Sequence, residues 1–545
     1  MQEEIFDFFR NPFVIFSLTF MLTFCVVSGS QQLGDAVELE FNAYRLHQYE
    51  ISGNIYGSKN FKVLYEAVHL NSRALRKCAI ALWNEIATED LTDLWALSSG
   101  AVLIFIPADL EKLGEKERED FLNFESRLAK VNTQLAVYVA PMSKNAHSII
   151  SDVSRKNMKS GTGFDQLISS ITGNTIQLTS SDTEPELPKN YKPHNIVARL
   201  RSSERAAPTI AFVAHYDSSS VIPALSPGSD SNGSGIVALL ELLAVLSKFY
   251  DKPSTRPPYN LLFIWTAAGK LNYQGARHWI DEYQRGNEDE KLDLAICIEA
   301  IGRKTDGLQM HVSKIPKDES VAANIFKRIK LLTPKMNMVS KKISLTSANS
   351  WEHEKFNIKR MPAVTISTLP SPTDPSRNSI LDDPNKIDEE ELMNNIRVIA
   401  ESVLGYILNL PIDGPSSDPR ITSDITMLSK DAIDKQRVHH FIRQFASKPR
   451  PVSDKEATEA TIANIAAAAS GYAQVSTSAV TITDAQAYGV LKNRLIAERV
   501  KPAVFELVIA SGVVGYLTLF YYIALNAQST LEGAIGTIRK TVYFK

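Results

Sequence analysis

Cysteine is scarce in this chain of 545 residues, with only Cys25, Cys78 and Cys297. A secreted disulfide scaffold and a zinc module built on cysteine ligands both need more. An excess of one charge is missing too, since 59 Lys and Arg face 61 Asp and Glu. The sequence therefore offers no basic surface for nucleic acid. The 44% of apolar residues excludes a disordered chain, and the length predicts about two to four domain-sized units.

An apolar run near the amino terminus predicts secretory targeting. Residues 13–27 have the length of a signal-peptide core, and small residues follow at Ser28, Gly29 and Ser30. We expect a signal peptide over residues 1–30. The segment before the run carries three acidic residues and Arg10 as its one basic residue, which is unusual for a signal peptide, so an uncleaved anchor is the alternative.

A second apolar run, over residues 503–525, predicts a single transmembrane helix. With a cleaved signal, the body would be lumenal and residues 526–545 would be a cytosolic tail. Ser511, Gly512 and Gly515 form a small-residue face on which another membrane helix could pack. The alternative is a plain anchor with incidental glycines.

The body between these runs reads as α/β. Short apolar segments rich in β-branched residues predict strands at 100–107, 134–140, 194–200, 209–214, 260–265, 293–298 and 362–367. The residues at 66–83 have a helical periodicity. Helical stretches separate several strands after residue 194, which predicts a largely parallel sheet covered by helices, with its site at the carboxyl ends of the strands.

Changes in composition suggest where the body divides. A polar, proline-containing stretch at 179–193 separates an α/β region at 31–190 from a second domain at 191–412. After it, we expect a mostly helical lumenal region over residues 413–500.

Residues that suit a metal site follow the strands of the second domain. His215 and Asp217 lie two apart at a predicted strand end, where the histidine can reach a metal with the aspartate behind it. Further motifs follow at 228–235, at 267–276, around Glu299 and around His353.

The order of these motifs resembles the co-catalytic zinc aminopeptidase superfamily, which also contains glutamate carboxypeptidase, the transferrin receptor and nicastrin. The resemblance covers roughly residues 190–412 and implies a zinc-aminopeptidase-like sheet. It places His215, Glu299 and His353 at ligand positions. The segment 269–275, Gly-Lys-Leu-Asn-Tyr-Gln-Gly, and the single predicted carboxy-terminal span are similar to the nicalin family within it.

This chain departs from the superfamily pattern at the positions that matter most for catalysis. Ser231 stands where the resemblance places the bridging aspartate, with Asp230 one residue early. Gly269 replaces the general base and Lys270 a ligand glutamate. A lysine ammonium disfavours cation binding, and loss of a general base costs about 10²–10⁴ in rate. The resemblance with these changes predicts a pseudo-peptidase without a metal cofactor, in which Lys270 pairs with Glu299 or Asp230.

Asn232 begins the one Asn-x-Ser/Thr sequence in the chain. In a lumenal protein it is a candidate glycosylation site at the mouth of the crevice.

The resemblance to nicalins implies a scaffold in the endoplasmic reticulum membrane. Its implied partners are a nodal modulator-type lumenal protein, a small multipass membrane subunit, and the translocon with multipass clients such as receptor subunits. Two alternatives stay open: a membrane-anchored zinc aminopeptidase, and a cell-surface receptor of the transferrin receptor type.

Overall fold

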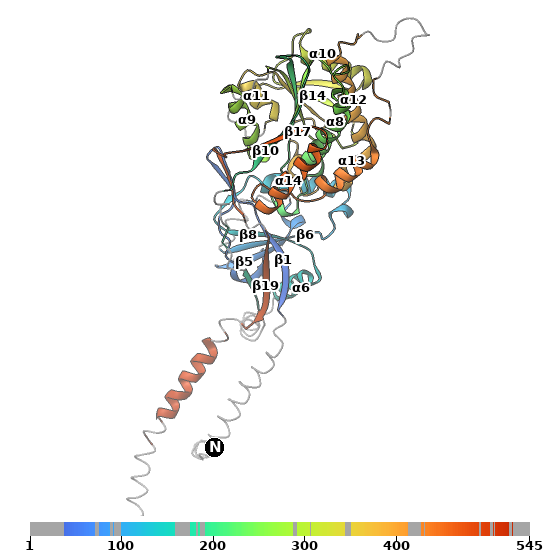
Figure 1. Cartoon of the computed structure of the whole chain (residues 1–545). Helices are drawn as coiled ribbons and strands as arrows, with labels where there is room; N and C mark the ends of the chain where they lie inside the picture. The colour runs from blue at the N-terminus through green and yellow to red at the C-terminus, as the bar shows by residue number, and fades with distance from the viewer. Residues whose placement is uncertain are drawn as a thin grey trace, which may run out of the picture.

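The computed structural model describes a body that runs from residue 38 to residue 501 and a separate helix near the carboxyl end (Figure 1). The described residues are 38–70, 76–87, 91, 100–158, 175–180, 184–185, 191–286, 291–305, 307–343, 350–412, 427–429, 431–489, 492–501, 505, 507–522 and 526. The predicted signal peptide and, apart from Asn526, the predicted tail lie outside these residues.

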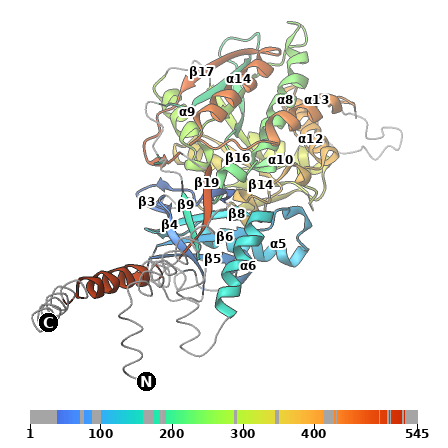
Figure 2. The same ribbon diagram turned by 90° about the horizontal axis from the view of Figure 1, so that it is seen from below.

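A closed barrel forms the part of the body drawn mainly in blue in Figure 1. Its strand order is β1 (Leu39–Arg45), β19 (Lys492–Val500), β9 (Thr175–Ser180), β4 (Leu64–His69), β5 (Lys77–Leu82), β6 (Ala101–Ile106) and β8 (Ala136–Pro141). Every side chain of β6 is buried, as its unbroken apolar sequence predicts. Helices α5 (Glu115–Leu128) and α6 (Lys144–Met158) lie against this part of the chain (Figure 2).

The helix expected over residues 66–83 is wrong. This stretch contributes strands β4 and β5, which pair in parallel from Glu66 with Lys77 to His69 with Ile80. In so short a segment, the spacing of apolar residues fits both a strand and a helix. Here the pairing with neighbouring barrel strands favours the strand.

An eight-stranded sheet forms the second part of the body. Its order is β15 (Asn337–Ser340), β14 (Gln309–Val312), β16 (Ala363–Ser367), β13 (Lys291–Ile298), β11 (Pro208–His215), β12 (Asn260–Thr266), β10 (His194–Leu200) and β17 (Gln474–Ala479). The central pairs β12–β11, β11–β13 and β13–β16 are parallel. Their carboxyl ends therefore meet at one edge, where the predicted site lies.

Helices cover both faces of this sheet (Figure 1). They are α8 (Gly235–Tyr250), α9 (Gln274–Gln284), α10 (Val321–Leu332), α11 (Glu352–Ile358), α12 (Glu389–Ile407), α13 (Lys435–Phe441) and α14 (Lys455–Ser470). Their apolar residues join those of the strands in two clusters, one on each side. The fold is thus the mixed α/β architecture that the sequence predicts.

The expectation of a mostly helical region over 413–500 is wrong for its second half. Residues after α14 form β17, β18 (Ala485–Ala487) and β19. β17 pairs with β10 at the edge of the large sheet, whereas β19 lies between β1 and β9 in the barrel. This region therefore completes both sheets.

The helix over Leu507–Tyr522 is apolar and exposed, and it extends away from the two sheets in both views (Figures 1 and 2). It falls within the predicted span at 503–525, although residues 503, 504, 506 and 523–525 lie outside the described part. Among the described residues, one helix is long and apolar enough to cross a membrane, Ser229–Tyr250, and 89% of its apolar window is buried in the core.

Candidate functional site

The strand β11 delivers His215 and Asp217 to the carboxyl edge of the sheet, and both are fully buried. Asp217 does not orient the histidine. Its carboxylate instead accepts hydrogen bonds from the backbone N–H groups of Gly269 (2.6 Å) and Lys270 (2.8 Å). It therefore fixes the turn Gly269–Leu271 beneath the histidine.

Gly269 approaches the ring of His215 closely. A Cβ atom added at Gly269 would lie 2.3 Å from Cβ of His215 and 2.4 Å from its Cγ. Real Cβ atoms do not come so near to another carbon, so this backbone has no room for a side chain. A glutamate at this position, the superfamily's general base, would require the turn or the histidine to move.

Lys270 follows directly and enters the same site, with its side chain 5% exposed. Its Nζ donates to Oγ of Ser231 (2.9 Å) and to the carbonyl of Arg377 (3.1 Å), and lies 3.8 Å from Oε1 of Glu299. Burial lowers the pKa of Lys270 to about 8, although Glu299 opposes that shift. The expected pairing of Lys270 with Glu299 is confirmed, and a cation lies where the superfamily has an acid.

Glu299 is held by a second cation. Nε and Nη2 of Arg377 donate to the two carboxylate oxygens of Glu299 at 2.5 Å and 2.9 Å, and Tyr273 OH donates at 3.2 Å. Burial would raise the pKa of Glu299, but Arg377, His215 and Lys270 together hold that pKa below its usual range. Arg377 also lies over the ring of Trp351, at 5.0 Å. Such a two-pronged contact satisfies both partners.

Asp230 belongs to a separate ion-pair group. Its carboxylate accepts from the backbone N–H of Gly302 (2.7 Å) and pairs with Nε of Arg303 (2.9 Å). Burial raises the pKa of Asp230 to about 6, against the opposing charge of Arg303. Asp382 also pairs with Arg303, with its Oδ1 3.1 Å from Nη2. Its Oδ2 accepts a hydrogen bond from the backbone N–H of Ser231 at 2.8 Å. Asp230 therefore pairs with Arg303, and Lys270 pairs with Glu299 and not with Asp230.

The two histidines at the predicted ligand positions are both buried. His215 Nε2 lies 4.0 Å from Glu299 and its Nδ1 lies 3.8 Å from Glu352, both beyond hydrogen-bond distance. Nδ1 of His353 lies 2.8 Å from Oγ1 of Thr365. Burial lowers the pKa of His353 to about 3.

The residues at this site do not fit the superfamily's pair of zinc ions. Such a pair needs carboxylates to bridge the ions and to offset their charge. Here both oxygens of Glu299 are engaged by Arg377, the bridging position is Ser231, and Lys270 adds positive charge. No group of three or more His, Cys, Asp or Glu within the described residues is placed to hold a metal ion.

The folded structure leaves no room for a glycan on the candidate site Asn232. Its side chain is fully buried, and Nδ2 donates to the carbonyls of His215 (3.2 Å) and Ile298 (2.9 Å). Oδ1 accepts from the backbone N–H of Gly235 at 3.1 Å. Because a glycan is attached through Nδ2, this amide cannot carry one in the folded chain. Asn232 instead ties together three segments of the sheet edge.

Several residues that shape the site carry no sequence motif. Arg377 lies in the short helix Pro375–Asn378, far along the chain from Glu299. Arg450 is buried and donates to the carbonyls of Tyr216 (2.8 Å) and Gly228 (3.0 Å), so the carboxy-terminal part of the body supports both site loops. Glu352 accepts from Thr266 at 2.6 Å. Glu352 stands next to His353, whereas nothing in the sequence marks Arg377 or Arg450.

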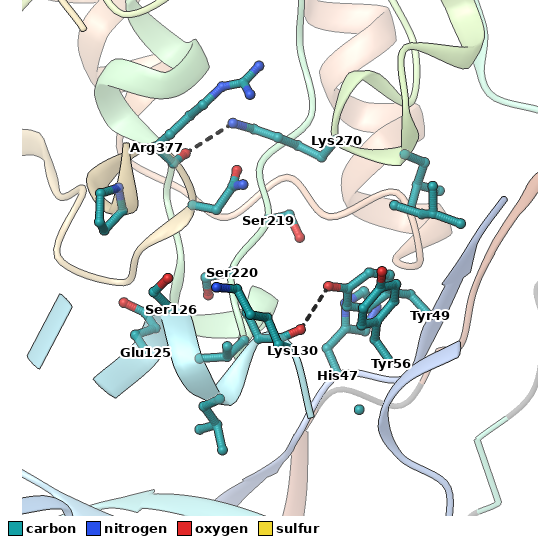
Figure 3. Close-up of a pocket in the computed structure, with 18 of the residues that line it drawn as sticks. His47, Tyr49, Tyr56, Glu125, Ser126, Lys130, Ser219, Ser220, Lys270 and Arg377 are labelled. Carbon is teal, nitrogen blue, oxygen red and sulfur yellow. Dashed lines mark hydrogen bonds between the residues drawn. The ribbon is translucent and has the colours of Figure 1, made fainter. Parts of the chain in front are cut away.

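A cavity of about 390 Å³ lies next to this site (Figure 3). Gly269, Lys270 and Arg377, from loops at the carboxyl edge of the eight-stranded sheet, lie on one side of the cavity. His47, Tyr49 and Tyr56 lie across from them. Tyr49 and Tyr56 lie on β2 (Tyr49–Ile51) and β3 (Asn54–Ser58) of a small four-stranded sheet, with the order β18, β2, β3 and β7 (Asn132–Thr133). This small sheet therefore forms one wall of the crevice.

Comparisons with known proteins agree with this architecture. The model of peptidase family M28 matches residues 195–403. The crystal structure of the gamma-secretase component nicastrin superimposes with a TM-score of 0.53 at 10% identity, covering 85% of this chain and 99% of that chain, which shows the fold alone.

Relatives with curated names are similar over most of their length. The chain is 62% identical to nicalin of Caenorhabditis elegans over 100% of both chains. It is 30% identical to the BOS complex subunit NCLN of Homo sapiens over 88% of each chain, and 30% identical to the BOS complex subunit ncln of Danio rerio over 89% of this chain and 90% of that one. The resemblance stated from the motifs is confirmed: the chain belongs to the nicalin family.

Proposed function

We propose that this chain is a catalytically inactive peptidase-fold scaffold in a membrane protein complex. The observation that carries the proposal is the two-pronged bond of Arg377 to Glu299, with Lys270 beside it. Two protein cations neutralise the carboxylate that a metal would need, and Gly269 leaves no space for a base. The same evidence disfavours the membrane-anchored zinc aminopeptidase.

Metal content and hydrolysis together test this proposal. The full chain would be purified in detergent, measured for zinc by mass spectrometry and incubated with aminoacyl fluorogenic substrates beside an active zinc aminopeptidase. We expect zinc well below one ion per chain and no hydrolysis above the buffer rate, with or without added zinc. Two tightly held zinc ions together with hydrolysis would overturn the proposal.

We infer further that the chain acts in the endoplasmic reticulum membrane, as the counterpart of the BOS complex subunits it resembles. Support comes from the names of those relatives and from the exposed apolar helix Leu507–Tyr522. The partners we propose are a nodal modulator-type lumenal protein, a small multipass subunit, and the translocon with its multipass clients. Affinity purification of the tagged chain from membranes, followed by mass spectrometry, tests this set. Recovery of the chain without membrane partners would contradict it.

A new glycosylation site tests whether the body is lumenal. Asp318 is exposed just before α10, and Asp318→Asn creates an Asn-x-Ser sequence ending at Ser320. We expect this variant to gain a glycan that endoglycosidase H removes, while Asp318→Ala gains none. A glycan resistant to this enzyme, with surface labelling of the chain, would favour the receptor alternative, and an unmodified Asp318→Asn would contradict the lumenal body.

A further inference from the structure

The cavity next to the site is built by both halves of the body. Its volume of about 390 Å³ lies within the range of small-ligand sites, roughly 300–1,000 Å³. Figure 3 shows Lys270 and Arg377 on one side and Lys130 with the aromatic residues on the other. A ligand in this space would contact the small four-stranded sheet and the loops at the carboxyl edge of the eight-stranded sheet at the same time.

Aromatic rings form one wall of the cavity. Tyr49 and Tyr56 are stacked with ring centroids 5.0 Å apart, and His47 lies 5.4 Å from Tyr49. The Tyr49 hydroxyl donates to the carbonyl of Ala129 at 3.2 Å, which fixes its ring. Rigid tyrosines of this kind offer apolar contact area at low entropic cost.

The charges along the cavity favour an anion. Lys130 is exposed at its rim, whereas Lys270 at its inner end is already paired with Glu299, so Lys130 is the cation that faces a ligand. Both acids in the lining are engaged by the protein. Glu125 accepts from the backbone N–H of Ile380 (3.0 Å) and from Ser379, and Asp374 accepts from the backbone N–H of Ser376 (2.9 Å).

The remaining lining groups suit a peptide backbone. Ser219, Ser220 and Asn272 add hydroxyl and amide groups to the lining. Groups of this kind can donate to carbonyls and accept from N–H groups. An extended chain of a few residues offers both, together with a side chain for the aromatic wall.

We propose that this cavity binds a carboxylate carried by an extended peptide, with Lys130 facing the anion and the Tyr49–Tyr56 wall packing against the neighbouring side chain. The carboxylate is either a chain terminus or an Asp or Glu side chain. The site requires no hydrolysis and no metal. It goes beyond the proposed function and does not depend on membership of a complex.

Isothermal titration of the detergent-solubilised full chain tests the proposal with three acetylated tetrapeptides. These are Ac-Ala-Tyr-Ala-Ala with a free carboxyl terminus, the same peptide as its amide, and Ac-Ala-Tyr-Glu-Ala amide. We expect at least one acidic peptide to bind, and the neutral amide to bind at least tenfold more weakly. Which acid binds identifies the source of the carboxylate. Equal binding of all three, or binding of none at millimolar concentration, would overturn the proposal.

Matched variants locate the binding. Lys130→Glu should lower the affinity for the acidic peptide at least tenfold, because it reverses the charge at the rim of the cavity. Lys252→Glu makes the same charge change at an exposed position outside the cavity and should leave affinity unchanged. Tyr56→Ala should weaken binding through the aromatic wall. Wild-type affinity in Lys130→Glu would contradict the site, and capture of membrane partners by this variant reports separately on the proposed function.

Discussion

Gly269 shows how one residue decides between two chemistries. Its backbone N–H donates to Asp217, and its α-carbon lies against the imidazole of His215. The glycine therefore lets the histidine and the turn share a space that would otherwise hold a side chain. The same glycine that removes the general base also allows the turn to pack against His215.

Gly269→Ala should therefore destabilise the chain. The added Cβ overlaps His215, and overpacking of this kind costs about 1–3 kcal/mol. Gly471→Ala is the control, since its nearest neighbour would be 3.7 Å away. We expect the thermal midpoint, followed by tryptophan fluorescence in detergent, to fall for the first variant and to stay or rise slightly for the second. Equal midpoints would show that the turn relaxes freely.

His47 predicts how stability depends on pH. Burial, reinforced by Arg45, lowers its pKa to about 3 from an ordinary value near 6.5. Between these values the unfolded state binds the proton and the folded state does not, so the free energy of unfolding decreases as pH falls below 6.5. The loss is about 1.4 kcal/mol per pH unit, or roughly 2 kcal/mol at pH 5.

The variant His47→Phe removes this titration and should reduce the slope of stability between pH 6.5 and pH 5 by about 1.4 kcal/mol per pH unit. His311 and His353 contribute to the remaining slope, because burial lowers the pKa of both as well. Urea unfolding at several pH values measures the slope. His147→Phe changes an exposed histidine on α6 and should keep the wild-type slope. A wild-type slope in His47→Phe would mean that His47 is protonated in the folded chain or that other groups account for the decline.

Residue-scale prediction succeeded where chemistry was local in sequence. His215, Ser231, Lys270 and Glu299 all lie at one site, because His215, Lys270 and Glu299 are at or just after strand ends and Ser231 directly precedes helix α8. Arg377 was missed because its loop has no periodicity and its partner is distant in the chain. The burial of Asn232 was not predicted, because a sequence motif carries no information about burial.

At the scale of elements, buried strands were the most predictable feature. The segments at 209–214 and 260–265 became β11 and β12 with nearly the expected bounds, because the parallel sheet is covered on both faces and its strands are continuously apolar. β17 was missed because it is an exposed edge strand of serine and threonine, without an apolar run. Its pairing with β10 depends on the tertiary fold.

Strand β19 yields a prediction of its own, since it has neighbours on both sides. Ala497 is buried and is opposite Leu39 on β1 and Leu178 on β9. Ala497→Pro removes a backbone donor in a central strand, and we expect a loss of about 2–4 kcal/mol. Hydrogen exchange should increase in peptides covering β1 and β9.

Ala479→Pro is the matched control for this change. Ala479 ends the edge strand β17, is exposed and pairs on one side with His194. Its effect should be smaller and confined to β10 and β17. If the Ala497 variant kept wild-type exchange in β1 and β9, the barrel would not depend on its closing strand.

At the scale of the whole molecule, the carboxy-terminal part of the body connects the two sheets. β17 extends the large sheet, and β19 closes the barrel. Before both strands in the chain, Arg450 donates hydrogen bonds to two loops of the site. The chain leaves the barrel at Val500, shortly before the exposed apolar helix Leu507–Tyr522. The barrel is therefore the part of the body nearest in sequence to the proposed membrane helix.

The face of that helix gives the prediction for assembly. Ser511 and Gly515 are one turn apart, and a Cβ at Gly515 would meet nothing within 4 Å, so the face is uncovered in the isolated chain. If a multipass subunit packs there, Gly515→Leu keeps the helix apolar but separates the backbones. Co-purification of membrane partners should then fall several-fold, while Val513→Leu, which changes the opposite face, should leave it unchanged. Equal recovery with both variants would place the contact elsewhere, on the body or on another face of the helix.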